Sequence, residues 1–313
     1  MIEPDETQFC IGSMCRLLSV SRSDYYGRKQ HPPSDRNRAN QLLVAEIKWV
    51  FDDERRRPGV PRIARLLQDQ DKPAGRHRIA RIMKANGWRA KVARKYKATT
   101  NSKHTLPVAP NLLGQDFNAD RPDQKWVSDI TYIWTDEGWL YLAVVLELYS
   151  RRVIGWAIAE RMTGTLVCDA LTMALWNRKM PKGVIIHSDR GNQYCSAVYQ
   201  KLLNKHQLVC SMSKRGDCFD NAAMESWNYS FKVEAVHGER FITRFEAKNQ
   251  VFEYIEIYYN RKLLHSKLGY LSPVAFEDNE NKKVASWVSV KSGQVHPDKL
   301  WLIFTNCRHD GTH

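Results

Sequence analysis

The hydrophobic residues of this 313-residue chain follow two different periods, and the change between them divides the sequence. Between residues 40 and 90, apolar side chains recur every three or four positions, which is typical of amphipathic helices. From Lys125 onward the pattern turns to alternation and to short apolar runs, which are typical of strands. The sequence therefore predicts a small helical part followed by a larger part that mixes strands and helices.

Three short helices are predicted in the first part, after a weaker candidate at Ile11–Leu18. Their expected ranges, read from apolar spacing and from proline and glycine, are 40–57, 59–71 and 76–87. A glycine-containing turn precedes the last helix, which suits a helix-turn-helix arrangement whose last helix enters the major groove of DNA. Any three-helix bundle has similar spacing, so the pattern alone leaves that alternative open.

Charge favours the DNA-binding interpretation of these helices. Residues 72–103 contain eleven Lys or Arg and no Asp or Glu, with Trp88 and Tyr96 among them. A basic run is often only a solvated face, but one this one-sided favours contact with phosphates. The candidate DNA contacts are Arg76, Arg78, Arg81, Arg89, Lys91, Arg94 and Lys95.

The composition of the whole chain points the same way. A net charge of +14 makes a polyanion the expected partner, with mere solubility charge as the alternative. No run approaches the ~18 apolar residues of a membrane span, and the first residues lack the pattern of a signal peptide, so we expect a cytoplasmic protein without a membrane partner. Seven cysteines without a C-x-x-C pair indicate reduced thiols and argue against a zinc site.

The second part of the chain predicts a mixed sheet of five strands with helices on both sides. Expected strands are 125–134, 141–148, 152–159, 184–189 and 208–212. Expected helices are 163–179, 196–205, 221–236 and 245–259. The predicted domains are an N-terminal helical segment 1–38, a basic helix-turn-helix-like domain 39–97, a linker 98–121, a catalytic core 122–278 and a tail 279–313.

Three acids occupy positions from which they could converge on one site. Asp129 lies inside a strand, Asp189 ends another strand, and Glu225 lies in the first turns of a helix. Two Mg²⁺ ions held by carboxylates can activate the nucleophile, stabilise the leaving oxygen and neutralise charge in phosphodiester chemistry. Each acid alone also has an ordinary structural explanation, and Asp129 is the hardest to dismiss because an unpaired buried charge is costly.

Neighbouring polar residues receive other roles. Lys232 follows Glu225 by seven positions, so both lie on one helical face. An ordinary surface lysine is the alternative, but next to the acids it is expected beside substrate phosphate. Asp217 is assigned to the solvated loop Ser213–Asp217, and Asp220 to capping of the helix. We expect that loop, with Lys214 and Arg215, to become ordered when DNA binds.

Several ordered motifs resemble the retroviral-integrase-like DDE transposases, and within them the OrfB proteins of bacterial insertion sequences of the IS-three family. The motifs are W-V-S-D-I-T-Y-I (126–133), E-L-Y-S-R (147–151), H-S-D-R-G-N-Q-Y (187–194), S-K-R-G-D-C-F-D-N-A-A-M-E-S (213–226) and Y-N-R-K-L-L-H-S-K-L-G-Y-L-S-P (259–273). The 35 residues between Asp189 and Glu225 match the gap for which that group is known.

The resemblance implies a ribonuclease H-like core in which Asp129, Asp189 and Glu225 bind two Mg²⁺ or Mn²⁺ ions and Lys232 lies near DNA. It implies hydrolysis at a transposon end, which frees a 3′-hydroxyl, and attack of that hydroxyl on another phosphodiester. It also implies a nucleoid-associated bacterial protein that self-associates on DNA.

The chain departs from the family pattern in three places. Glu147 stands where relatives usually have Asp, at a position that is not a catalytic ligand. The helix-turn-helix and zipper segment that such elements encode in a first reading frame does not precede Met1, so the product of that frame is an expected partner. Trp287, Trp301 and Phe304 lie beyond the matching motifs, either packed on the core or in a degenerate end.

Two other functions stay open on the sequence. One is a nuclease that cuts without joining, which would use the same three acids. The other is a non-catalytic DNA-binding regulator derived from a transposase.

Overall fold

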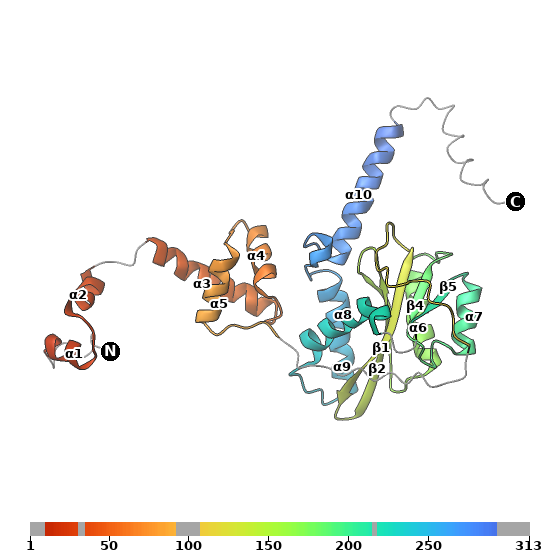
Figure 1. The fold of residues 1–313 in the computed structure, drawn as a ribbon, viewed down its shortest axis with the longest axis horizontal. Helices are drawn as coiled ribbons and strands as arrows, with labels where there is room; N and C mark the ends of the chain where they lie inside the picture. Colours follow the sequence, from red (N-terminus) through yellow and green to blue (C-terminus); the bar gives the residue numbers. More distant parts are fainter. Residues whose placement is uncertain (1–9, 31–34, 92–106, 215–217, 293–313) are drawn as a thin grey trace. The chain divides into compact units, whose positions relative to one another are not determined.

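The computed structural model describes residues 10–30, 35–91, 107–214 and 218–292 (Figure 1). The chain separates into two compact units, Met1–Lys91 and Val92–His313, and each is described by itself. Among the described helices, none is both long and apolar enough to cross a membrane. Five cysteines in the described part, Cys10, Cys15, Cys168, Cys195 and Cys210, are free.

The first unit is all helical, as the sequence predicts. Its helices are α1 (Ile11–Leu17), α2 (Arg22–Gln30), α3 (Asp35–Asp53), α4 (Val60–Asp69) and α5 (Arg76–Ala85). The last three pack around a common core of Leu43, Ile47, Val50, Phe51, Ile63, Leu67, Ile79 and Met83. Trp88, just after α5, stacks on Phe51 with ring centroids 6.4 Å apart.

Two helix starts in this unit differ from the prediction. The helix α2 was not predicted because its sequence is mostly polar, although Ser21 gives a start signal by accepting a hydrogen bond from the N–H of Asp24 at 3.0 Å. The helix α3 begins at Asp35, earlier than the predicted Asn40. Its first turn is exposed, so no apolar spacing marks it.

The second unit is built on a five-stranded sheet in the order β3-β2-β1-β4-β5. The strands are β1 (Lys125–Thr135), β2 (Gly138–Glu147), β3 (Val153–Ala159), β4 (Ile185–Ser188) and β5 (Val209–Met212). The first three form an antiparallel meander, while β4 pairs parallel to β1 and β5 parallel to β4. The predicted mixed five-stranded sheet is confirmed.

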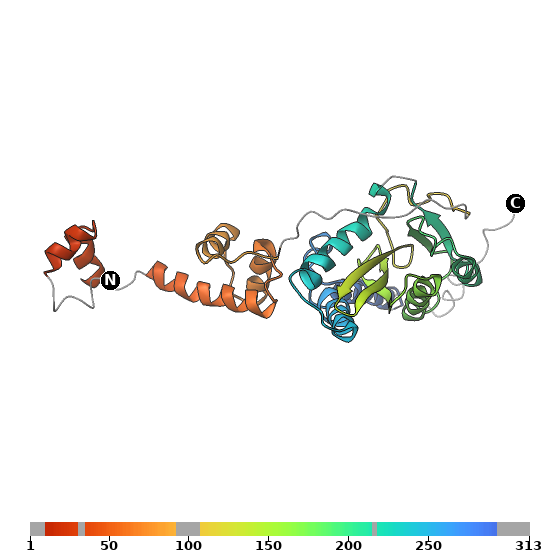
Figure 2. The same ribbon diagram turned by 90° about the horizontal axis from the view of Figure 1, so that it is seen from below.

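Helices cover both faces of this sheet (Figure 2). One face packs against α6 (Gly164–Asn177) and α7 (Ala197–Lys205), around Trp126, Ala143 and Val145 of the strands. The other packs against α8 (Ala222–Phe231) and α9 (Arg244–Phe252), around Val127, Leu142 and Val144. Each of the latter two helices runs on into a π-helical turn, η3 (Lys232–Val236) after α8 and η4 (Glu253–Tyr259) after α9. Glu234 of η3 accepts a hydrogen bond from the Tyr254 hydroxyl of η4 at 2.9 Å.

The described half of the predicted linker 98–121 is not a free linker. Leu113 is buried in the core beside α8 and α9, and the N–H groups of Leu112 and Leu113 donate to the Ser211 hydroxyl of β5. The sequence prediction relied on a polar, proline-containing composition, which missed that single buried leucine.

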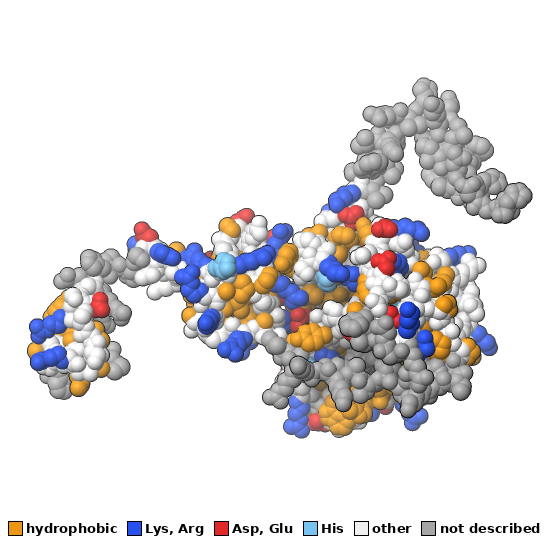
Figure 3. All heavy atoms as spheres, in the orientation of Figure 1, with side chains coloured by type: hydrophobic (Ala, Val, Ile, Leu, Met, Phe, Trp, Pro, Cys, Tyr) orange, Lys and Arg blue, Asp and Glu red, His pale blue; other side chains and the backbone are white. Residues whose placement is uncertain are grey.

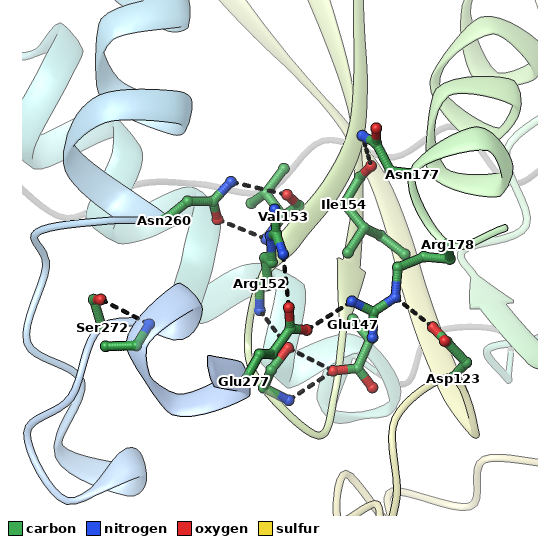
Figure 4. Close-up of polar contacts among 12 residues, drawn as sticks. Asp123, Glu147, Arg152, Val153, Ile154, Asn177, Arg178, Asn260, Ser272 and Glu277 are labelled. Atoms are coloured by element: carbon green, nitrogen blue, oxygen red, sulfur yellow. Dashed lines mark hydrogen bonds and ion pairs between the residues drawn. The ribbon is translucent and has the colours of Figure 1, made fainter. Parts of the chain in front are cut away.

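The motif at 259–273 and the turn between β2 and β3 hold each other in place (Figure 4). The Asn260 side chain pairs with the backbone of Val153 in both directions, at 3.0 and 2.9 Å, and so acts as an extra strand partner for β3. The Tyr259 hydroxyl donates to the carbonyl of Arg151 at 2.9 Å. Two family motifs that are far apart in sequence therefore form one structural joint.

Glu147 lies buried beneath that turn and stabilises it. Its carboxylate accepts from the N–H of Tyr149 at 2.9 Å and from both the N–H and the hydroxyl of Ser150, at 2.6 and 2.7 Å. Burial raises the pKa of Glu147, while the Ser150 bonds act against the rise. The departure from the usual Asp is thus accommodated at a structural position.

Arg178, at the end of α6, ties three elements together (Figure 4). Its guanidinium lies 2.7 Å from Asp123 before β1 and 2.7 Å from Glu277 of α10 (Pro273–Ser292). Glu277 also pairs with Arg152 at 2.7 Å, and these charges hold the pKa of Glu277 below its ordinary value against the effect of burial. The start of α10 therefore belongs to the folded core, whereas Trp287, Trp301 and Phe304 have side chains outside the described residues.

We expect Arg178→Met to destabilise the second unit, because Asp123 would lose its ion pair with Arg178 and Glu277 would keep its pair with Arg152 alone, both in partly buried surroundings. The loss should be about 3 kcal/mol, or a melting temperature lower by roughly 10 °C in thermal unfolding. Lys283→Ala, which breaks the exposed pair with Glu280, is the matched control and should melt like the parent. Equal melting of both variants would contradict the structural role of Arg178.

Candidate active site

The pairing of β1 with β4 brings Asp129 and Asp189 to one place. The parallel register joins Lys125 to Ile185 and Val127 to His187. Continued for two more residues, it sets Asp129 opposite Asp189, just after β4 ends at Ser188. Paired residues of neighbouring strands point to the same face, so both carboxylates face the side covered by α8 and α9.

The Asp129 carboxylate is held from two sides. One oxygen accepts from the N–H of Ile130 and the other from the Asn228 side chain of α8, both at 2.8 Å. Burial first, and then the negative charge of Asp189, raise the pKa of Asp129 to about 8; the charge of Glu225 adds to this rise. The three predicted acids therefore act on one another electrostatically.

The Asp189 carboxylate closes the turn that follows β4. Its Oδ1 accepts from the N–H of Gly191 at 2.9 Å. A Cβ atom at position 191 would lie 3.0 Å from the same oxygen, so a larger residue would crowd the carboxylate. Arg190 donates to the carbonyl of Ser213 at 2.6 Å, which links this turn to the end of β5.

Glu225 lies exposed in the first turn of α8, and partial burial of its carboxylate raises its pKa. The start of the helix is positioned by Asp220, which lies in the short turn η2 (Cys218–Asn221). The Asp220 carboxylate accepts from the N–H of Lys214 and from the side chains of Asn111 and Gln115, at 2.6, 2.8 and 3.2 Å.

The prediction that Asp220 caps α8 is wrong. Asn221 occupies the N-cap position and makes no side-chain cap bond. Asp220 is buried one residue earlier, because its oxygens are taken by donors from the 107–115 segment and from Lys214. Asp217 and Arg215, also named from the sequence, lie outside the described residues.

Two further residues of the site were not singled out from the sequence. Asn228 carries no motif signal, and its role becomes visible only when α8 is packed on β1; its Oδ1 is buried without a hydrogen-bond partner in the structure. His187, inside the H-S-D motif, lies between the Ser211 and Ser213 hydroxyls at 2.8 and 3.1 Å. Burial lowers the pKa of His187 to about 4, so it is neutral near pH 7 and joins β4 to β5 beneath the site.

Lys232 extends from the start of η3 toward β1. Its ammonium group donates to the backbone carbonyl of Tyr132 and lies 4.6 Å from the centroid of the Tyr132 ring. Burial lowers the pKa of Lys232 to about 8. The side chain therefore rests against the strand that carries Asp129.

The donor chemistry of the site fits a hard divalent cation. Three carboxylates supply the oxygen ligands that Mg²⁺ prefers, and a cation would relieve the charge that raises the pKa of Asp129. The orphaned Asn228 Oδ1 beside them is a further oxygen donor. Within the described residues, however, no three His, Cys, Asp or Glu side chains are already close enough to hold a metal ion.

The predicted DNA contacts are spread over both units. Arg76, Arg81, Arg89 and Lys214 are exposed, and Lys91 is half-buried. Arg78 is half-buried and donates to Asn40 of α3 at 2.9 Å. Lys and Arg side chains are prominent on the visible face of α3 to α5 (Figure 3). Arg94 and Lys95 lie outside the described residues.

Models of known protein families match the helical unit and the sheet-containing unit separately. Residues 38–96 match the model of an HTH-like domain, and residues 119–218 and 225–280 match two models of an integrase core domain. The two core models together contain Asp129, Asp189 and Glu225.

Curated relatives match over nearly the whole chain. The transposase InsF for insertion sequence IS3A of Escherichia coli (strain K12) is 48% identical over 286 residues, which cover 91% of this chain and 98% of the relative. A 31 kDa protein of the insertion element IS600 of Shigella sonnei is 45% identical over 87% of this chain and 100% of its own length.

Solved structures match more weakly. The catalytic core domain of HTLV-2 integrase, solved in complex with magnesium, is 14% identical, with a TM-score of 0.37 over 50% of this chain and 97% of that one. At this level of likeness, the relationship rests on the family models and the curated relatives.

The raised pKa of Asp129 predicts that, without metal ions, stability falls as pH rises. The folded state keeps a proton that the unfolded state has released, so the stabilisation is lost as pH rises through about 8. Between pH 6.5 and 8, His187 and Lys232 contribute least to the pH dependence of stability. With their shifted pKa values, the protonation of His187 differs between the folded and unfolded states from about pH 4 to 6.5, and that of Lys232 only above about pH 8.

We therefore expect the free energy of unfolding to fall by about 1 to 2 kcal/mol from pH 6.5 to 8 in a chelating buffer, as measured by urea titration. Asp129→Asn, which removes the titrating group, should lose most of this dependence. The same slope in both proteins would show that Asp129 is ionised throughout the range.

Proposed function

The chain belongs to the IS3 family of insertion-sequence transposases, and we propose that Asp129, Asp189 and Glu225 are the residues with which it cuts and joins DNA. It is a DNA transposase with an HTH-like DNA-binding domain and an integrase core. The observation that carries the residue assignment is the β1–β4 register, which sets Asp129 opposite Asp189 beneath α8.

Each acid has a distinct task in this proposal. Asp129 and Asp189 supply two carboxylates at fixed points of the sheet. The Asp129 carboxylate is fixed by its hydrogen bond from Asn228, and the Asp189 carboxylate by its hydrogen bond from the N–H of Gly191. Glu225 approaches from the exposed first turn of α8 and completes the set when DNA enters. The chemistry is hydrolysis at a transposon end, followed by attack of the freed 3′-hydroxyl on another phosphodiester.

Two Mg²⁺ or Mn²⁺ ions, when bound by these carboxylates, would supply an activated oxygen nucleophile and neutralise charge on phosphorus and on the leaving oxygen. The chain's own part is to hold three negative groups together against their repulsion. The raised pKa of Asp129 supports this task, because burial and the charge of Asp189 both disfavour its ionised form, and a bound cation would offset both effects.

Lys232 and the loop after β5 are proposed to hold the phosphates of the reacting strand. Lys232 lies on α8's continuation beside β1, and Lys214 is exposed at the start of the loop that also contains Arg215. The basic residues of the helical unit, Arg76, Arg78, Arg81, Arg89, Lys91, Arg94 and Lys95, are proposed to bind backbone phosphates of the transposon end.

The proposal includes partners beyond DNA. Joining two ends requires at least two copies, so we propose self-association on DNA, with the product of a first reading frame as a further partner. The site of action would be the bacterial nucleoid in the cytoplasm. A nuclease that cuts without joining would use the same three acids, and a purely regulatory protein would need none of them; no specific observation favours either.

Asp129→Asn, Asp189→Asn and Glu225→Gln should each reduce both cleavage and joining of transposon-end DNA below detection in Mg²⁺ or Mn²⁺, because each removes a charged ligand. DNA binding, measured by fluorescence anisotropy, should survive in all three. The assay uses the chain with and without its partner frame and scores cleavage and strand transfer separately.

The matched control is Asp116→Asn, which removes an exposed acid of the same unit that pairs with Lys125. It should leave both steps unchanged. Wild-type joining by the Asp189→Asn variant would sink the assignment, and cleavage without joining by the parent would favour the nuclease.

Replacement of Arg76, Arg78 and Arg81 by Ala should weaken DNA binding and reduce the slope of log affinity against log salt concentration by up to about three. The matched control replaces Arg38, Lys48 and Arg65, which each pair with an acid on their own helix. Because those charges are already balanced, the control should keep the parent's slope. An unchanged slope in the first variant would place the binding surface elsewhere.

A further inference from the structure

The turn end of the β1–β2 hairpin carries a row of exposed aromatic rings. Trp134 and Trp139, which are paired across the two strands, are 56% and 44% exposed. Their ring centroids lie 4.8 Å apart, and Trp139 also makes an edge contact with Tyr132 at 5.1 Å. Figure 1 shows this end of the hairpin extending beyond the rest of the sheet. The three residues are called the aromatic row below.

The row begins beside the proposed reaction site. Tyr132 follows Asp129 by three residues on β1, and alternation along the strand turns its ring to the opposite face. Lys232 lies beside this point of β1, since its ammonium group contacts both the carbonyl and the ring of Tyr132. A cation therefore lies next to the first ring of the row, three residues along β1 from Asp129.

The acids at the hairpin turn each bond to a neighbouring residue. Asp136 pairs with Arg240 at 3.0 Å, and Glu137 accepts from the N–H of Arg244 at 2.7 Å. The Arg244 side chain in turn pairs with Glu160 at 3.0 Å. Lys232 is a cation in direct contact with the row.

We propose that Tyr132, Trp139 and Trp134 stack the unpaired bases of a DNA strand whose phosphates pass Lys232. Every base offers a π face, so a row of rings binds bases without reading their sequence. The proposal deepens the function above and rests on the chain handling DNA, but not on the identity of the catalytic acids.

A second copy of the chain is the rival occupant, and area argues against it. An aromatic side chain covers roughly 150–250 Å² when fully buried, so three partly exposed rings offer about 300 Å². A stable interface needs about 800 Å² from each partner. The row alone is too small for a dimer, whereas it is large enough for two or three stacked bases.

The experiment uses the full chain in a chelating buffer, so that no cutting or joining is needed. Affinities are measured for a blunt duplex and for the same duplex with a single-stranded extension. The parent should prefer the extended duplex, and Trp134→Ala with Trp139→Ala should weaken that preference by about tenfold for each ring removed. Binding to the blunt duplex should stay unchanged.

Three controls separate stacking from other causes. The double variant Trp134→Phe, Trp139→Phe keeps two aromatic rings and should retain most of the preference for the extended duplex. If the alanine variant lost the preference only because it misfolded, this comparison would not depend on the presence of aromatic rings. Trp176→Ala removes a tryptophan that is 71% exposed on α6 and should behave like the parent. Photo-crosslinking from 5-iodouracil in the extension should label the peptide that contains Trp134 or Trp139.

The outcomes are distinct. Lack of preference for the extension in the parent, or labelling only of other peptides, overturns the proposal. So does an alanine variant that keeps the preference but loses self-association in sedimentation, because the occupant would then be a second copy. If the parent protein failed to cleave and join DNA but still crosslinked at the row, the catalytic assignment would be wrong. The aromatic row would remain a DNA-binding surface.

Discussion

The repulsion between two carboxylates on neighbouring strands is the constraint around which the second unit is organised. The β1–β4 register forces Asp129 and Asp189 together, and the packed sheet does not let them separate. Hydrogen bonds hold them in place: Asp129 accepts from the amide of Asn228 and the N–H of Ile130, and Asp189 accepts from the N–H of Gly191. The ionised form of Asp129 is disfavoured by burial and by the charge of Asp189, and a bound divalent cation would stabilise it.

The sequence predicted those features that depend on local periodicity. Alternation along 125–134 assigned Asp129 to the same face as Val127 and Ile133, and the structure confirms the strand, the sheet and the helix that bears Glu225. It could not predict contacts between distant residues. Asn228 bonds to a residue 99 positions away, and Asp220 to one 109 positions away, so neither role has a local signal. Composition misled where one buried residue, Leu113, outweighed a polar segment.

Family motifs do not all mark chemistry. The side chains of Tyr259 and Asn260 bond to the backbone of Arg151 and Val153, at the turn between β2 and β3, so they serve a structural contact. The buried Glu147 and the ion pairs of Arg178 add to this joint. These contacts fix edge strand β3 and the start of α10 to the sheet that carries Asp129.

The early end of β4 also exposes β1 to a different hazard. Pairing with β4 stops at Val127, while β1 runs on to Thr135, and a strand edge of this kind is a template for pairing with another chain. Lys232 places a charged group on that edge by bonding to the carbonyl of Tyr132. A strand edge can also be blunted when a neighbouring helix covers it. Lys232 therefore occupies one carbonyl of this edge as well as serving its proposed substrate, and a substitution there would free that carbonyl.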